Sequence, residues 1–170
     1  MADTEHSKCF ARQGVRVRVP LPALFLCPLT CGNVVGGLFL ILLVHNPSTL
    51  ITGSRDWKAD YVITHALHDA WSAAGKPLPE EVTLVTGKCP TGADYLAGVL
   101  AIKAGWTIEP HPADWEKYGR RAGFVRNAEM VDLGADLVLA FIRNDSKGAT
   151  MTVKLAKKAG LPMVVWRVND

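Results

Sequence analysis

The chain of 170 residues allows one ordinary domain with a tail, and its hydrophobic content of 49% is enough to bury a core. The net charge of +3 is concentrated near the start: residues 1–48 hold four lysines and arginines against two acids, whereas residues 49–170 hold 15 against 14. A nearly neutral domain has no strong global field to attract nucleic acid, which argues against such a partner without excluding it.

Residues 1–47 are predicted to lie outside the fold, as an N-terminal extension. An uncharged stretch from Val19 to Val44 follows several arginines, which is the outline of a signal anchor. Prolines and glycines interrupt it, and its compact apolar part, Leu38–Val44, has seven residues, where a spanning helix needs about 20. We therefore expect a cytoplasmic protein without membrane association. The extension is either disordered or the product of a mis-extended start, since Arg16–Pro20 can be encoded by a tRNA T-arm pattern.

The cysteines and histidines do not predict a disulfide framework or a metal site. Three of the four cysteines lie in the extension, and only Cys89 lies in the presumptive domain, where a passive loop thiol is expected. Cys27 and Cys31 lack a second Cys or His pair at zinc spacing. His65 and His68 have no acidic or cysteine partners nearby, so packing or surface roles fit them better. No metal or other cofactor is predicted.

From residue 49 onward, short apolar runs alternate with stretches of helical periodicity that end at glycines. The predicted strands cover residues 49–53, 82–87, 106–111, 135–143 and 162–168, and the predicted helices cover residues 56–75, 92–105, 121–134 and 148–160. This alternation predicts an α/β fold: a Rossmann-like open parallel sheet of about five strands with helices on both faces, in one domain of residues 48–170.

Three strand-to-helix turns carry glycine, at residues 53–56, 87–94 and 144–150. Each follows the carboxyl end of a strand, so all three are expected at one edge of the sheet, where open parallel sheets bind ligands. Glycine allows a close backbone approach, and helix N-termini attract anions. The alternative is purely structural: Thr91 and Asp94 fit a capping box, and Asp56 and Ser146 are ordinary cap residues. Composition and spacing leave these two readings evenly balanced.

The second turn has the Gly-x-x-x-x-Gly spacing of a P-loop, at Gly87 and Gly92, but Ala93 and Asp94 stand where a Lys-Ser/Thr pair is needed. That lysine binds the β- and γ-phosphates and the hydroxyl binds magnesium. Triphosphate hydrolysis is therefore not expected. A carboxylate at position 94 suits a ribose hydroxyl or a backbone cap better than a phosphate.

Four segments, "LITGSRDW", "LVTGKCPTGADYLA", "GFVRNAEMVDLGADLVLAF" and "SKGATMTVKLAKKAGLPMVV", together resemble the SLOG superfamily of Rossmann-like proteins. This superfamily includes the lonely-guy-type nucleoside-monophosphate phosphoribohydrolases and the DNA-processing protein A family, and the YspA-type (cpYpsA-related) branch is the most similar. The resemblance implies a domain that binds a nucleotide or a nucleotide-derived ligand. The ligand-binding residues expected on this basis are Gly53, Ser54, Arg55, Gly87, Lys88, Thr91, Gly92, Ala93, Asp94, Arg126, Asn127, Ser146, Gly148, Ala149 and Thr150.

Arg55 and Arg126 are expected to bind phosphate, and Asp94 to bind ribose or orient its loop. For both arginines a surface ion pair is the structural alternative. The sequence departs from the phosphoribohydrolases after Gly148, because residues 151–153 include no glutamate. Cleavage of an N-glycosidic bond needs a carboxylate, which Asp94 or Asp145 would have to supply. Catalytic residues, and whether any reaction is catalysed, therefore stay open.

The leading expectation is a domain that binds a nucleotide-derived small molecule in order to sense or process it. The alternatives are a nucleoside 5'-monophosphate phosphoribohydrolase and a single-stranded nucleic-acid-binding protein, and a homo-oligomer stays open. His111 ends the third predicted strand near the loops, and Trp115 and Tyr118 lie in a polar loop. The two aromatic residues either stack on a base or cover the crevice.

Overall fold

The computed structural model describes residues 16–18 and 46–169, and its centre is a sheet with the strand order β1-β6-β5-β2-β3-β4. The strands are β1 (Arg16–Arg18), β2 (Ser48–Gly53), β3 (Thr83–Thr86), β4 (Thr107–Pro110), β5 (Leu137–Arg143) and β6 (Met163–Val168). Strands β2 to β6 are all parallel, which confirms the predicted open parallel sheet.

Strand β1 comes from the N-terminal extension and pairs antiparallel with β6, with Val17 opposite Trp166. A strand at the edge of a sheet exposes unpaired N–H and C=O groups, and β1 satisfies those of β6. Apolar periodicity could not predict this strand, because it has three residues and ends where the uncharged stretch begins. The other expectations for residues 1–47 lie outside the described residues, apart from 46 and 47.

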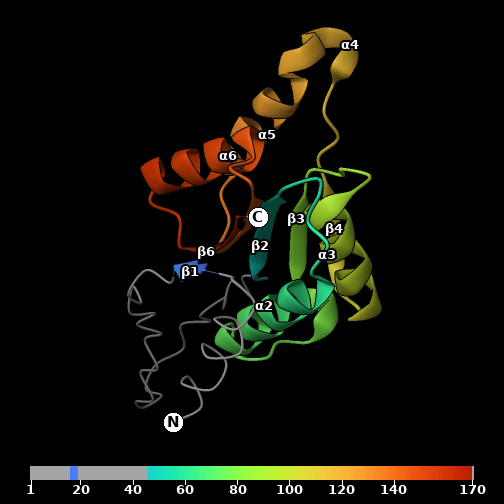
Figure 1. Ribbon diagram of the computed structural model, residues 1–170. Helices are drawn as coiled ribbons and strands as arrows, with labels where there is room; N and C mark the ends of the chain where they lie inside the picture. Colours follow the sequence, from blue (N-terminus) through green and yellow to red (C-terminus); the bar gives the residue numbers. More distant parts are fainter. Residues whose placement is uncertain (1–15, 19–45, 170) are drawn as a thin grey trace, which may run out of the picture.

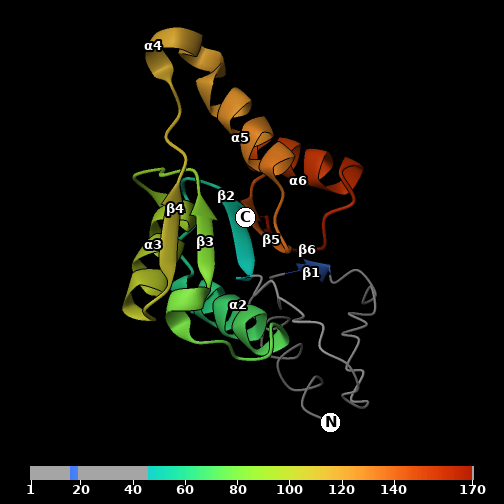
Figure 2. The same cartoon turned by 180° about the vertical axis from the view of Figure 1, so that it is seen from behind.

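Four helices cover the two faces of the sheet (Figures 1 and 2). Helices α2 (Asp60–Ala73) and α3 (Gly92–Lys103) lie on one face, and α5 (Ala122–Leu133) and α6 (Lys147–Lys158) lie on the other. Short helical turns also form at η1 (Pro79–Glu81), α4 (Trp115–Tyr118) and η2 (Gly119–Arg121), where the sequence predicted loops. In both views α4 and the start of α5 project beyond the sheet.

Helix α2 begins four residues later than the predicted start at Asp56, because the chain first makes a turn. The backbone N–H of Trp57 donates to the carbonyl of Ser54 over 3.2 Å, and the Trp57 indole donates to the carbonyl of Ala59 over 3.0 Å. Ala59, and not Asp56, is the N-cap of the helix. The capping role considered for Asp56 is therefore wrong, and Asp56 instead lines a pocket at the carboxyl end of β2.

Side chains of the buried strands alternate between two cores, as expected for a sheet covered on both faces. Ile51 packs with the residues of α2 and α3, whereas its neighbour Leu50 packs with Met130 and Val131 of α5. On the α2 side, the ring of Phe141 lies 4.7 Å from that of Trp166 in a stacked pair and 5.3 Å from that of Trp57. These large side chains anchor the central strands that carry the glycine turns.

The order of the parallel strands reverses direction between β2 and β5. From β2 the chain proceeds to β3 and β4 on one side, and from β5 it proceeds to β6 on the other. In such sheets a crevice opens outside the carboxyl ends of the two strands that flank the reversal. No helix in residues 46–169 is long and apolar enough to cross a bilayer.

The close packing of β2 against α3 gives a test of the fold. A Cβ atom at Gly53 would lie 2.3 Å from the Cβ of Ala93 and 2.8 Å from the carbonyl oxygen of Phe141. We expect Gly53→Ala to lower the free energy of unfolding by about 1–3 kcal/mol through overpacking. The matched control is Gly98→Ala within α3, which meets no atom within 4 Å and should raise stability by about 0.5–1 kcal/mol. Urea unfolding measures both, and equal stability of the two variants would contradict the packing described here.

Candidate ligand-binding site

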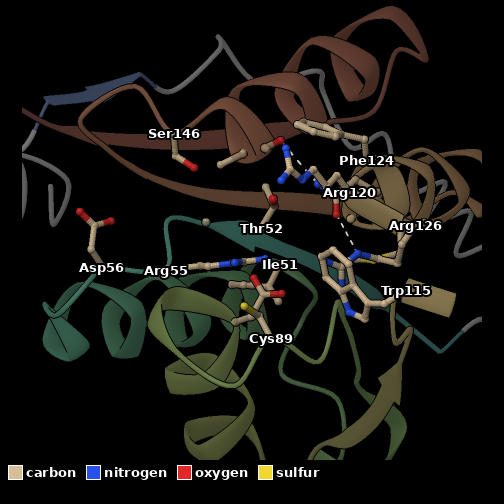
Figure 3. Close-up of a pocket in the computed structure, with 17 residues that line it drawn as sticks. Ile51, Thr52, Arg55, Asp56, Cys89, Trp115, Arg120, Phe124, Arg126 and Ser146 are labelled. Carbon is tan, nitrogen blue, oxygen red and sulfur yellow. Dashed lines mark hydrogen bonds between the residues drawn. The ribbon is translucent and has the colours of Figure 1, made fainter. Parts of the chain in front are cut away.

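A pocket of about 370 Å³ lies at the carboxyl ends of β2 and β5, between the turns of β2 and β3 on one wall and α5 and α6 on the other (Figure 3). Its lining residues are Ile51, Thr52, Gly53, Arg55, Asp56, Cys89, Asp94, Trp115, Arg120, Gly123, Phe124, Arg126, Asn127, Met130, Ser146, Gly148 and Ala149.

The structure brings eight of the fifteen predicted ligand-binding residues to this pocket. They are Gly53, Arg55, Asp94, Arg126, Asn127, Ser146, Gly148 and Ala149. The other seven lie in the same turns but are not among the lining residues: Ser54, Gly87, Lys88, Thr91, Gly92, Ala93 and Thr150. The three predicted turns thus meet at one edge of the sheet.

Ser54 is a buried junction between three segments. Its hydroxyl accepts a hydrogen bond from the Arg143 N–H over 2.8 Å and donates to the Arg143 carbonyl over 3.2 Å. Its carbonyl accepts from the backbone N–H groups of Trp57 and Ala93, both over 3.2 Å. The next residue, Arg55, is exposed, and its side chain extends into the pocket (Figure 3). The turn therefore buries Ser54 and leaves Arg55 facing the pocket.

The β3–α3 loop has P-loop spacing but does not offer its helix end to the pocket. Gly92 has a φ of 74°, and a Cβ atom there would lie 2.2 Å from the carbonyl oxygen of Ser54. The first turn of α3 thus packs on the Ser54 carbonyl, which takes the Ala93 N–H. A phosphate could reach that donor only by displacing a protein carbonyl. Gly92 serves close packing between two turns here.

Asp94 is the buried acid of the pocket, with 8% of its surface exposed. Desolvation raises the pKa of Asp94 to about 6, although Arg126, backbone hydrogen bonds with Gly87 and Cys89, and Arg55 each act to lower it. Thr91 is the N-cap of α3 as the capping-box alternative requires, but its side chain makes no capping hydrogen bond within the described ranges. Asp94 therefore organises the loop that precedes the helix and also faces the pocket.

Arg126 crosses from α5 to the ends of two strands. Its Nη1 donates to the carbonyl of Gly87 and, over 3.1 Å, to the carbonyl of His111, and its Nε donates to Oδ1 of Asn127 over 2.8 Å. Burial lowers the pKa of Arg126, and the nearby Asp94 and Cys89 oppose that effect. The His111 side chain turns to Glu109, 2.7 Å away, and does not line the pocket.

The turn before α6 contributes Ser146, Gly148 and Ala149 to the second wall. Ser146 is the N-cap of α6, as the structural alternative required, although its side chain makes no capping bond within the described residues. The preceding residues Asn144 and Asp145 have φ of 47° and 50°, an uncommon conformation that reverses the chain direction at the pocket rim. Asp145 does not line the pocket; its carboxylate lies 3.4 Å from the guanidinium of Arg167.

Sequence reasoning missed the part of the wall that comes from η2 and the start of α5. Trp115 and Phe124 line the pocket with 52% and 41% of their surfaces exposed, and Arg120 lies between them in the chain. A helical signal was present, because residues 120, 123, 124, 127 and 130 follow steps of three and four. Extending that face backward from Asn127 would have found Arg120 and Phe124. Trp115 was considered for base stacking, and it does border the pocket.

The pocket and its neighbourhood carry no evident metal site. Among the described residues, no group of three or more His, Cys, Asp or Glu side chains could hold a metal ion. Cys89 is a free, half-buried thiol that lines the pocket. The site therefore consists of arginines, one buried acid, a thiol, aromatic rings and backbone groups.

This fold and site define a Rossmann-like α/β domain with a ligand pocket at the reversal in strand order. The model of the YspA, cpYpsA-related SLOG family matches residues 47–118. The "Gene 61 protein" of Mycobacterium phage D29 is 39% identical over 120 residues, which is 68% of this chain and 92% of the phage protein. The chain belongs to this SLOG family, and as a member it is a domain that binds or processes a ligand. No solved structure matches it.

The buried carboxyl predicts a pH dependence of stability. Because its pKa is about 6 in the folded chain against 3.8 for the free group, the folded state holds the Asp94 proton more tightly than the unfolded state. Stability from this group is therefore full below pH 3.8 and is lost as the pH rises to about 6. The loss is up to about 3 kcal/mol.

Asp94→Asn removes this titration. We expect the difference in unfolding free energy, wild type minus variant, to fall as the pH rises from 3.8 to about 6. Urea titrations at several pH values measure it. The subtraction cancels the other carboxylates. A difference that does not change with pH would show that Asp94 titrates normally.

Proposed function

We propose that this domain binds a nucleotide or nucleotide-derived molecule in the pocket, in order to sense or process it. The observation that carries the proposal is that three arginines, one buried acid and two half-exposed aromatic rings border a single pocket of about 370 Å³. That volume lies within the roughly 300–1,000 Å³ range of small-molecule sites. Phosphate, sugar and base each have a chemically matched partner there.

The cationic side chains suit the phosphate portion. Arg55, Arg120 and Arg126 line the pocket, whereas Asp56 and Asp94 are its acidic residues, so the wall carries a net positive charge when both are ionised. Arginine binds phosphate oxygens in a bidentate way. The backbone at Ser146 and Gly148, at the start of the 12-residue helix α6, adds the positive end of a helix dipole at the same wall.

Trp115 and Phe124 suit the base, and Asp94 suits the sugar. The two aromatic side chains lie on the wall opposite Asp56 (Figure 3). Stacking of a base on an aromatic ring is worth about 1–3 kcal/mol. Asp94 lines the pocket, and its carboxylate accepts hydrogen bonds, as binding to a ribose hydroxyl requires. These assignments rest on complementary chemistry and on the family's ligand-binding character.

Calorimetry with AMP, cyclic AMP and ADP-ribose tests the proposal. We expect one or more of them to bind the wild type, and Arg55→Gln to weaken that binding about 10- to 100-fold, because a charge-assisted contact is lost. Lys58→Gln is the matched control, since Lys58 is exposed in the same turn and does not line the pocket. A folded protein that binds none of these compounds at millimolar concentration would refute the proposal.

A second candidate function is the hydrolysis of a nucleoside monophosphate at its N-glycosidic bond, and the buried Asp94 favours it. The pKa of about 6 makes its carboxylate a stronger base than an ordinary aspartate while leaving it ionised at neutral pH. In this reaction water attacks C1' of the ribose and gives its proton to Asp94. The electron pair of the C1'–N bond passes to the base, whose nitrogen takes a proton from solvent.

Incubation with AMP and chromatographic detection of free adenine decide this second function. If it holds, adenine appears with ribose 5-phosphate, kcat/KM rises with pH to a plateau above about 6, and Asp94→Asn abolishes the release. Asp145→Asn is the control, because that carboxylate points to Arg167 and does not line the pocket. Absence of adenine release at high enzyme concentration rejects hydrolysis of AMP but leaves ligand binding intact.

A further inference from the structure

The three arginines of the pocket differ in how their side chains are held. We infer that Arg126 is a positioning residue that fixes an arm over the pocket, and that Arg120 and Arg55 make the direct contacts with an anionic ligand. The arm is residues 115–124, which comprise α4, η2 and the first turn of α5. The direct-contact half of this inference rests on the proposed function, whereas the positioning half does not.

Most N–H donors of Arg126 already make hydrogen bonds to the protein. Nη1 is shared between the carbonyls of Gly87 and His111, and Nε is bonded to Asn127. Gly87 follows β3 and His111 follows β4, so one side chain of α5 ties two strand ends together. A ligand phosphate that took these donors would leave two backbone carbonyls at the pocket wall without them, which carries a penalty. The guanidinium is therefore suited to hold α5 in place.

The chain is shaped to accommodate this guanidinium. A Cβ atom at Gly87 would lie 1.8 Å from Nη1 and 2.2 Å from Cζ of Arg126, so a side chain there would displace the group. Gly87 is buried and has no positive φ to explain the glycine. With the guanidinium in this place, position 87 has no room for a side chain.

Asn127 extends this hydrogen-bonded connection to α6, on the second wall of the pocket. Its Oδ1 receives the Arg126 bond, and its Nδ2 donates to the carbonyl of Gly148 at the start of α6 over 3.5 Å. Arg126 and Asn127 thus connect the β3 and β4 ends to α6 through α5. The arm continues directly from this point and projects beyond the sheet (Figures 1 and 2). Its placement over the pocket depends on where these two residues hold α5.

Arg120 and Arg55 are held differently. Both are exposed, both line the pocket, and within residues 46–169 neither guanidinium has a hydrogen-bond partner. They approach from different walls, Arg55 from the β2 turn and Arg120 from the arm (Figure 3). Two guanidinium groups on facing walls, with N–H donors that make no hydrogen bond within residues 46–169, can bind one anionic group between them. Such binding brings the arm and the β2 turn together on the ligand.

Hydrogen exchange of the intact chain, followed by mass spectrometry, tests the positioning half. We expect Arg126→Gln to increase amide exchange in residues 115–124 by about tenfold, because hydrogen bonds that hold α5 are lost. Gly87→Ala should do the same, since it displaces the guanidinium without removing it, and the three atoms nearest to the added Cβ all belong to the flexible end of the Arg126 side chain. Arg121→Gln, an exposed neighbour outside the pocket lining, should exchange like the wild type. Unchanged exchange of the arm in either folded variant overturns the positioning role.

Calorimetry with inorganic pyrophosphate at fixed ionic strength tests the direct contacts. We expect Arg120→Gln to bind at least tenfold more weakly than the wild type while its arm exchanges normally, and Arg121→Gln to bind like the wild type. Equal affinity of Arg120→Gln and the wild type overturns the role of Arg120. If the wild type does not bind pyrophosphate at millimolar concentration, the direct-contact half and the phosphate assignment of the proposed function both fail, and the exchange experiment still decides the role of Arg126.

Discussion

The hydrogen bonds of Ser54 hold together the edge on which the site is built. Its hydroxyl joins β2 to the end of β5, and its carbonyl receives the first turn of α3. Both neighbouring glycine positions follow from this junction: Gly53 lets Ala93 approach, and Gly92 lets α3 reach the Ser54 carbonyl. A buried hydroxyl and carbonyl with all partners inside the protein are costly to disturb. This rigid junction is what allows the next residue, Arg55, to be presented to the pocket.

At Asp94, burial raises the pKa while nearby charges and hydrogen bonds lower it, and the effect of burial is the larger one. Asp94 has two arginines and two backbone hydrogen bonds that favour its charged form, and desolvation still raises its pKa. Its carboxylate is therefore a poorly solvated charge in a pocket that three arginines also line. An anionic ligand that excluded more water would strengthen the field between Asp94 and the arginines. The charge state of Asp94 therefore depends on the same arginines that would face an anionic ligand.

Much of the fold could be predicted from the sequence, because periodicity and glycine stops report directly on buried strands and helix ends. The five parallel strands and four main helices are confirmed, and the three glycine turns do meet at one edge. The start of α2 was predicted too early, because the Trp57 turn depends on a side-chain bond to Ala59. The helical spacing of Arg120 and Phe124 was present in the sequence, but long-range contacts such as Arg126 to Gly87 decide that this face borders the pocket. Turn identity is local information, whereas the position of a projecting helix is not.

The two walls of the pocket belong to successive parts of the chain. Residues 51–94 form one wall, and residues 115–149 form the other, while the family model matches residues 47–118 and thus ends within the arm. The first wall is fixed by backbone packing around Ser54. The second is joined to it by the pairing of β2 with β5, by the Ser54–Arg143 hydrogen bonds, and by the side chains of Arg126 and Asn127. Arg120 and Phe124 line the pocket but lie outside the buried core, so substitutions at these two positions change the chemistry of the pocket at little cost to the packing of the sheet.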